Sequence, residues 1–94
     1  MTRFAAGDAV VVRDDWPETR GPAHIRTPHY VRGRRGMVRS YLGRFANPED
    51  LAFGRPAAPL DLYHVAFPPR SIWSEAVAGD EIVVELYDSW LEAA

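Results

Sequence analysis

The sequence contains no cysteine and no lysine. Without cysteine the chain cannot form a disulfide, bind a metal through a thiolate or use a thiol as a nucleophile. All eleven basic residues are arginine, whose planar guanidinium stays charged when buried and matches anions with two oxygens. The apolar run near the start is too short and interrupted for a signal peptide, and no later run could span a bilayer. We therefore expect a cytoplasmic protein, and its 94 residues predict one domain.

Signatures of catalysis are also missing. No nucleophile elbow, phosphate-binding loop or dinucleotide fingerprint occurs. Two pairs of adjacent acids, Asp14-Asp15 and Glu49-Asp50, lie near prolines in predicted loops, where solvated acids are common. None of the three histidines, His24, His29 and His64, has the i, i+4 spacing of a metal-binding pair on a helix. The chain by itself therefore predicts neither an active site nor a metal site.

The net charge of −2 conceals a strong asymmetry along the chain. Residues 20–44 include seven arginines and no acid, whereas the residues after Arg70 include six acids and no base. The simplest interpretation is that the two regions fold together and neutralise each other. The densest stretch, HIRTPHYVRGRRG at residues 24–36, has three possible explanations. It is a solvated loop, a nucleic-acid grip, or a set of arginines aimed at an anion on another chain.

The pattern of apolar residues predicts short strands and no long helix. A single helical turn is expected within residues 27–33, a helical or 3₁₀ turn within 71–77, and a last short turn and strand within 88–94. Residues 44–61 are predicted to be a long connection, of the kind that is functional or mobile. Strands are predicted at residues 7–13, 36–43, 62–67 and 80–87. The predicted fold class is therefore all-β: one small SH3-like β-barrel over residues 1–94, with short helical or 3₁₀ turns.

Alternation within the first strand assigns its two faces. Val10 and Val12 share one face, and Ala9 and Val11 share the other. Because both faces are apolar, we expect the outer one to be covered by the long connection or by a partner. The remaining aromatic residues of interest are interpreted as core or interface residues: Trp73, Tyr87 and Trp90.

Five segments in order resemble the C-terminal half of the nitrile hydratase β subunit. The combination H-I-R-x-P-x-Y-x-R-G-x-x-G followed by D-x-W-L-E is specific, and the order and spacing hold across nearly the whole chain. The segments are FAAGDAVVVRD, HIRTPHYVRGRRGMV, LYHVAF, IWSE and GDEIVVELYDSWLEAA.

The resemblance implies an SH3-like barrel that binds no cofactor itself. In that family Co(III) or Fe(III) is held by the α subunit through cysteines, two of them oxidised to sulfinic and sulfenic acids. The metal acts there as a Lewis acid on the nitrile. The arginine of the H-I-R triplet, Arg26 in this sequence, would reach across the interface to those oxidised sulfurs. The motif residues expected to contact the partner are His24, Ile25, Pro28, Tyr30, Arg32 and Arg34.

The motif residues other than Arg26 have alternative interpretations. Arg32 and Arg34 would contact the α partner or satisfy loop carbonyls. Tyr30 is interpreted as a packing anchor rather than a catalytic phenol. Arg35, Arg39 and Arg44 have the pattern of ordinary strand or turn surface.

The sequence also departs from the family, because it lacks the helical N-terminal half of β and the α subunit's cysteine motif. It would then be a small subunit of a three-chain nitrile hydratase or thiocyanate hydrolase, with a metal-binding α-type subunit and a helical subunit as partners. The alternatives are an assembly or metal-loading partner, an RNA-binding barrel of ribosomal type, and a protein–protein adaptor. The acidic C-terminal third argues against nucleic acid. The substrate, a nitrile or thiocyanate, is not encoded in this chain.

Overall fold

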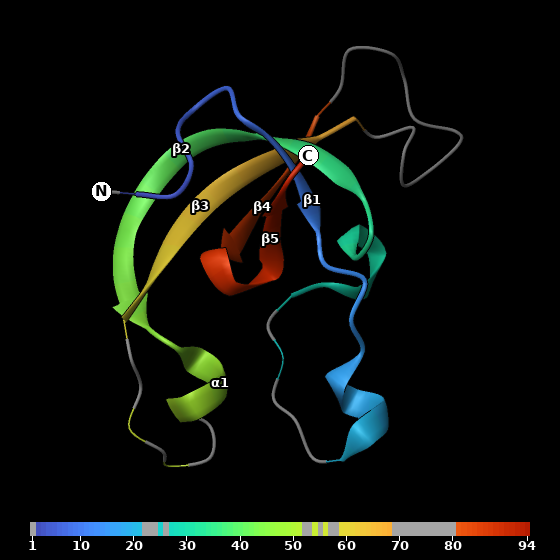
Figure 1. Cartoon of the computed structure of the whole chain (residues 1–94), viewed down its shortest axis with the longest axis vertical. Helices are drawn as coiled ribbons and strands as arrows, with labels where there is room; N and C mark the ends of the chain where they lie inside the picture. The colour runs from blue at the N-terminus through green and yellow to red at the C-terminus, as the bar shows by residue number, and fades with distance from the viewer. Residues whose placement is uncertain are drawn as a thin grey trace.

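The computed structural model describes residues 2–21, 25, 27–51, 54, 56, 59–68 and 81–94, except for the side chains of residues 50 and 51. Within these ranges the chain forms one antiparallel sheet of five strands in the order β4-β3-β2-β1-β5. Figure 1 shows the long strands β2 and β3 curving around the shorter β1, β4 and β5. The prediction of an all-β fold is confirmed, and the curved sheet is consistent with an SH3-like barrel.

The predicted strands are present with shifted ends. The strands are rich in β-branched and aromatic residues, whose side chains suit a strand that is buried on one face. The strands are β1 (Ala9–Val12), β2 (Arg35–Ala46), β3 (Pro59–Phe67), β4 (Ile82–Tyr87) and β5 (Leu91–Ala93).

The prediction of an unstructured connection over residues 44–61 is wrong at both ends. Strand β2 continues to Ala46, and β3 already begins at Pro59, with Phe45 opposite Leu60. Helix α1 (Pro48–Leu51) adds one turn between them. Local turn signals suggested a loop, but pairing between β2 and β3 satisfies the backbone of both segments across two register shifts. Proline is tolerated at Pro59 because it is the first residue of its strand.

In the described parts of the chain, the 3₁₀ turns η1 (Pro17–Arg20) and η2 (His29–Val31) lie between β1 and β2, and η4 (Asp88–Trp90) lies between β4 and β5. The predicted turn within residues 27–33 is confirmed as η2, and the predicted C-terminal turn and strand are η4 and β5. Turn η1 was not predicted, although Pro17 suits its first position. The turn predicted at residues 71–77, including Trp73, lies outside the described residues.

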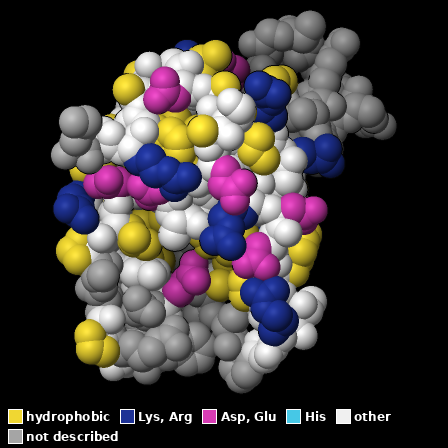
Figure 2. Space-filling view, viewed as in Figure 1, with side chains coloured by type: hydrophobic (Ala, Val, Ile, Leu, Met, Phe, Trp, Pro, Cys, Tyr) yellow, Lys and Arg dark blue, Asp and Glu magenta, His cyan; other side chains and the backbone are white. Residues whose placement is uncertain are grey.

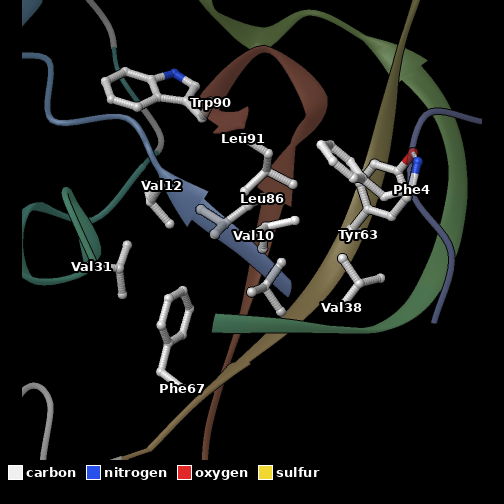
Figure 3. Packing of buried hydrophobic residues seen from close by; sticks show 11 residues of the cluster. Phe4, Val10, Val12, Val31, Val38, Tyr63, Phe67, Leu86, Trp90 and Leu91 are labelled. Atoms are coloured by element: carbon white, nitrogen blue, oxygen red, sulfur yellow. Dashed lines mark hydrogen bonds between the residues drawn. The ribbon is translucent and has the colours of Figure 1, made fainter. Parts of the chain in front are cut away.

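The core lies inside the curve of the sheet. Figure 3 shows Phe4 and Tyr63 at one end of the cluster and Trp90 at the other. Val10 and Val12 are fully buried, as alternation predicts, while Ala9 is exposed and Val11 is half-buried. The outer face of β1 is therefore only partly covered by the described residues. Buried residues of the cluster are Phe4, Val10, Val12, Val31, Val38, Tyr63, Val65, Phe67, Leu86, Trp90 and Leu91.

Gly36, in β2, lies very close to side chains and backbone of the neighbouring strand β3. A Cβ atom at this position would lie 2.8 Å from both Phe67 Cε1 and Val65 Cγ1, and 2.9 Å from the Ala66 carbonyl oxygen. Such contacts are shorter than real Cβ atoms make, and one of them is to backbone that cannot move aside. A residue without a side chain is therefore required at this position, where β2 lies close to Val65, Ala66 and Phe67 of β3.

Candidate functional site

Arg32 occupies the centre of the arginine-rich segment. Its side chain has 0% exposure, although it follows the short turn η2 at the surface. Its two terminal nitrogens donate to Glu18 Oε1 and Oε2, both at 2.8 Å, in a forked pair. They also donate to the carbonyl oxygens of Thr27 at 2.9 Å and Asp15 at 3.2 Å. This is the bidentate geometry in which arginine binds a carboxylate most strongly.

Two tryptophans enclose the same guanidinium. The Arg32 Cζ atom lies 4.8 Å from the ring centroid of Trp16 and 4.7 Å from that of Trp90. Each indole nitrogen is held by an acid, since Trp16 Nε1 donates to Asp14 and Trp90 Nε1 donates to Glu49. Stacking of a guanidinium on aromatic faces is favourable and favours one orientation of its plane. We call Arg32, Glu18, Trp16 and Trp90 the Arg32 clamp.

The clamp joins three segments that are far apart in sequence. Glu18 and Trp16 come from the η1 region, Arg32 follows η2, and Trp90 ends η4. The hydrogen bonds from Arg32 lower the pKa of Glu18 from its usual 4.5 to about 2. His29 adds a further contact, with its Nε2 atom 3.1 Å from Glu18 Oε2. Glu18 is therefore ionised at neutral pH and the clamp keeps both of its charges.

The clamp also anchors residues that border Arg26 in sequence. Thr27 is buried, and its carbonyl accepts a hydrogen bond from Arg32. Ile25 is half-buried and packs against the hydrophobic core. Arg26 itself and His24 lie outside the described residues. The described residues on either side of Arg26 are thus held by packing on one side and by the clamp on the other.

The other motif residues have different environments. Pro28 is half-buried, whereas Tyr30 and Arg34 are exposed. Of the two roles considered for Arg32, its bonds to Thr27 and Asp15 are those of a residue that satisfies loop carbonyls. Contacts of any of these residues with a partner stay a prediction.

Sequence reasoning did not identify Glu18 and Trp16 as parts of this site. Both lie in the stretch DDWPE, which has the composition of a solvated loop. The available signal was that this stretch contains the acids nearest in sequence to an acid-free block of arginines. Proximity in sequence alone did not indicate which arginine would be buried against them.

Among the described residues, one ion pair joins the basic region 20–44 to the acidic end as expected, that of Arg39 with Glu81. Arg3 and Arg13, which precede that region, also reach acids of the end: Arg3 bonds Asp88 at 2.6 Å and Arg13 lies 4.0 Å from Glu92. The other paired arginines of the region, Arg20, Arg32 and Arg44, contact acids before Arg70 instead. Figure 2 shows basic and acidic side chains next to one another on the face in view. Exposed pairs of this kind stabilise a fold only weakly, so their main effect here is to neutralise charge.

Metal ligands do not gather in the described part of the chain, which contains no group of three or more His, Cys, Asp or Glu side chains placed to hold an ion. A thiolate ligand is excluded for the whole chain, because the sequence has no cysteine. Among the described residues, no helix is long and apolar enough to cross a membrane.

The fold and the site together define a small all-β domain that presents an internally braced, arginine-rich segment. The chain belongs to the family described as nitrile hydratase beta subunit, C-terminal, whose model matches residues 1–93. The resemblance noted in the sequence is thereby confirmed.

Individual relatives agree with this assignment. The nitrile hydratase β subunit of Pseudomonas chlororaphis is 37% identical over 93 residues, which are 97% of this chain and 40% of that subunit. A low-molecular-weight cobalt-containing nitrile hydratase β subunit of Rhodococcus rhodochrous is 36% identical over 94% of this chain and 38% of its own length. The chain thus spans about 40% of the length of the curated relatives it matches.

A solved structure also matches the whole chain. The recombinant apo-enzyme of thiocyanate hydrolase from Thiobacillus thioparus contains a chain that is 27% identical, with a TM-score of 0.84. The match covers 100% of this chain and 78% of that one. The fold described here therefore makes up most of that chain.

Proposed function

We propose that this chain is a single SH3-like barrel domain, over residues 1–94, of a hetero-oligomeric enzyme of the nitrile hydratase type. It acts together with a metal-binding α-type partner and contributes the guanidinium of Arg26 to oxidised cysteine ligands of that partner. The chain is not catalytic alone, and the substrate is a nitrile or thiocyanate. The observation that carries the proposal is the Arg32 clamp, which braces the arginine-rich segment that defines the family motif.

The chemistry of an oxidised cysteine suits an arginine supplied from another chain. A sulfinate is an anion with two oxygens, which a guanidinium fork matches with charge-assisted hydrogen bonds. A sulfenate is reactive and persists only where it is shielded and bonded. An arginine brought against both groups would hold them in their oxidised form and orient them. It would act as a positioning residue and would not transfer a proton.

An ordered backbone next to Arg26 matters because an arginine that binds oxidised cysteines must reach the interface in one orientation. A flexible loop would lose conformational entropy on docking, which weakens binding and spreads the positions of the charge. Here Ile25 packs on the core and Thr27 is bonded to Arg32, so the neighbouring backbone is already ordered. The clamp keeps Arg32 bonded within the chain, so Arg32 is not the arginine that would be offered to the partner.

The metal would lie in the partner and not in this chain. The present chain has no cysteine, and its described residues hold no cluster of metal ligands, so its residues fit a supporting role beside the metal. A Co(III) or Fe(III) ion bound by the partner would supply Lewis-acid chemistry to the substrate. This chain would contribute the guanidinium of Arg26 to the partner's oxidised ligands.

The matches also bear on how the enzyme is assembled. The curated β subunits have more than half of their length beyond the matched region, whereas the thiocyanate hydrolase chain is matched over 78% of its length. This difference supports an arrangement in which the barrel and a helical partner are separate subunits. The helical subunit would then provide the region that corresponds to the N-terminal half of a complete β subunit.

The test is to purify the complex with its α-type and helical partners and to replace Arg26 by lysine. Because lysine keeps the charge but not the fork, we expect the complex to form and to retain its metal while turnover falls about tenfold to a hundredfold. Mass spectrometry of the partner should show reduced or over-oxidised cysteines in place of the paired sulfinic and sulfenic acids. Arg44→Lys, at an exposed position on β2, is the matched control.

Two results would contradict the proposal. Wild-type turnover and unchanged cysteine oxidation in Arg26→Lys would remove the role of this arginine. A wild-type chain that raises metal content in the α-type subunit, but is absent from the purified active enzyme, would instead identify an assembly or metal-loading partner.

A further inference from the structure

Two neighbouring arginines differ from the other described arginines in having no acid beside them. Six of the eight arginines in the described ranges form an ion pair within 4.0 Å, whereas Arg34 and Arg35 form none with the described residues. Their backbone is nevertheless ordered, since Arg34 bonds both Val31 and Val12, and Arg35 pairs with Val11 across the sheet. Arg34 and Arg35 are thus two consecutive exposed arginines on an ordered backbone. The six paired arginines are Arg3, Arg13, Arg20, Arg32, Arg39 and Arg44.

These arginines border a groove with an apolar floor. The groove has a volume of about 880 Å³, and its lining includes Arg34, Arg35, Met37, Phe67 and Glu81. Its floor continues across the outer face of the sheet as a row of four residues in register on β1, β2, β3 and β4: Ala9, Met37, Ala66 and Val83.

The floor of the groove is unusually accessible for apolar side chains. Met37 is 48% exposed and Val83, near the start of the edge strand β4, is 49% exposed, while Ala66 between them in the row is buried. Exposed apolar surface bordered by charge is typical of protein-binding sites, and methionine adapts its shape to a partner. The outer face of this sheet therefore has the composition of an interface.

The charges of the groove indicate what kind of molecule it binds. Two unpaired guanidinium groups attract carboxylates, and the apolar floor accommodates an aliphatic or aromatic side chain between them. Nucleic acid is a poorer match, because the one aromatic residue in the described lining, Phe67, is only 1% exposed and cannot stack on a base. Glu81 at the rim is paired with Arg39, which also lines the groove, so the charge left without a partner is that of Arg34 and Arg35. An acidic protein segment fits this surface best.

We propose that the groove is a docking site for an acidic segment of the α-type partner, with two carboxylates against Arg34 and Arg35 and an apolar side chain against Met37. The identity of the partner rests on the proposed function. The role differs from that of Arg26, since the groove lies on the outer face of the sheet and contributes to assembly rather than to the metal centre. It also changes the interpretation of Arg35, whose sequence context indicated ordinary surface.

The experiment measures association of this chain with the purified α-type subunit. The test variant is Arg34→Ala/Arg35→Ala, and the control is Arg3→Ala/Arg44→Ala, which removes the same charge from exposed positions outside the groove. Kd and association rate are measured at low and at physiological salt. Circular dichroism melting shows whether each variant is folded. Met37→Glu provides a second, independent perturbation of the apolar floor.

For the test variant we expect Kd to increase about tenfold to a hundredfold, with a slower association rate and a weaker dependence on salt. The control should change Kd less than about threefold. Met37→Glu should weaken association because it brings a carboxylate towards those of the partner. Equal loss of affinity in the test and control variants would also refute the proposal, because only total charge would then matter.

Other outcomes separate this inference from the proposed function. If both groove variants bind the α-type subunit as the wild type does, the groove proposal fails and the role of Arg26 is unaffected. If the wild-type chain does not bind the α-type subunit at all, both proposals fail. Binding of RNA that is lost in Arg34→Ala/Arg35→Ala would show that the groove recognises phosphates, and would also overturn the inference.

Discussion

Replacement of Arg32 by lysine tests the structural basis of the whole arginine-rich segment. The change keeps the positive charge and removes the planar fork. In the wild type, two terminal nitrogens make four hydrogen bonds, two to the Glu18 carboxylate and one each to the carbonyls of Thr27 and Asp15. A lysine ammonium has one nitrogen, on a flexible stem that is shorter than the arginine side chain. It can approach Glu18 but cannot reach both carbonyls from the same position.

The expected cost follows from the contacts that are lost. Two lost hydrogen bonds to carbonyls cost about 1 kcal/mol each, and the poorer stacking on two indoles costs about 0.5 kcal/mol each. We therefore expect the free energy of unfolding to fall by about 3 kcal/mol. In a domain of this size that change lowers Tm by roughly 15 °C.

Thermal unfolding followed by circular dichroism measures this change, and tryptophan fluorescence reports on Trp16 and Trp90 beside the guanidinium. Arg20→Lys is a suitable control, because Arg20 is bonded to Asp15 on an exposed surface and its substitution should cost little. A Tm for Arg32→Lys within about 2 °C of the wild type, with unchanged fluorescence, would show that charge alone holds this segment. Neither the forked hydrogen bonds nor the indole stacking of Arg32 would then contribute measurably to stability.

Two further predictions follow from single residues. Gly36→Ala should destabilise the fold by about 2 kcal/mol, because the new methyl group collides with Phe67, Val65 and backbone; an unchanged urea midpoint would contradict this. The second concerns Glu18, whose folded-state pKa of about 2 lies below its ordinary 4.5. The stability it adds is present above pH 4.5 and is lost as the pH falls from there through 2. The difference in urea midpoint between wild type and Glu18→Gln should therefore shrink between about pH 7 and about pH 3, and a constant difference would exclude this coupling.

Local patterns were sufficient for most of the strands because they depend on neighbours in sequence. Alternation at residues 9–12 correctly placed Val10 and Val12 in the core. The extension of β2 to Ala46 was not predictable in this way, since glycine and polar residues favour a loop there. Pairing with β3 overrides that local preference by bonding the backbone of both segments.

The candidate site shows the same division. The motif around Arg26 is recognisable from the order and spacing of its residues, and the family match to residues 1–93 agrees with it. The partner of Arg32 was not predictable, because the acid that binds it is separated from it by 14 residues and an intervening turn. The tryptophan that completes the stack comes from the other end of the chain.

The sequence by itself determined the all-β class, the absence of thiol chemistry, the charge asymmetry and the family motif, because each depends on residue type or on spacing along the chain. Only the tertiary structure decided which arginines are buried, paired or free. Burial and pairing depend on distances between residues remote in sequence, so seven arginines that look alike in the sequence acquire different roles. Folding encloses Arg32 between two tryptophans, pairs Arg39 with Glu81, and leaves Arg34 and Arg35 exposed at the edge of an apolar groove.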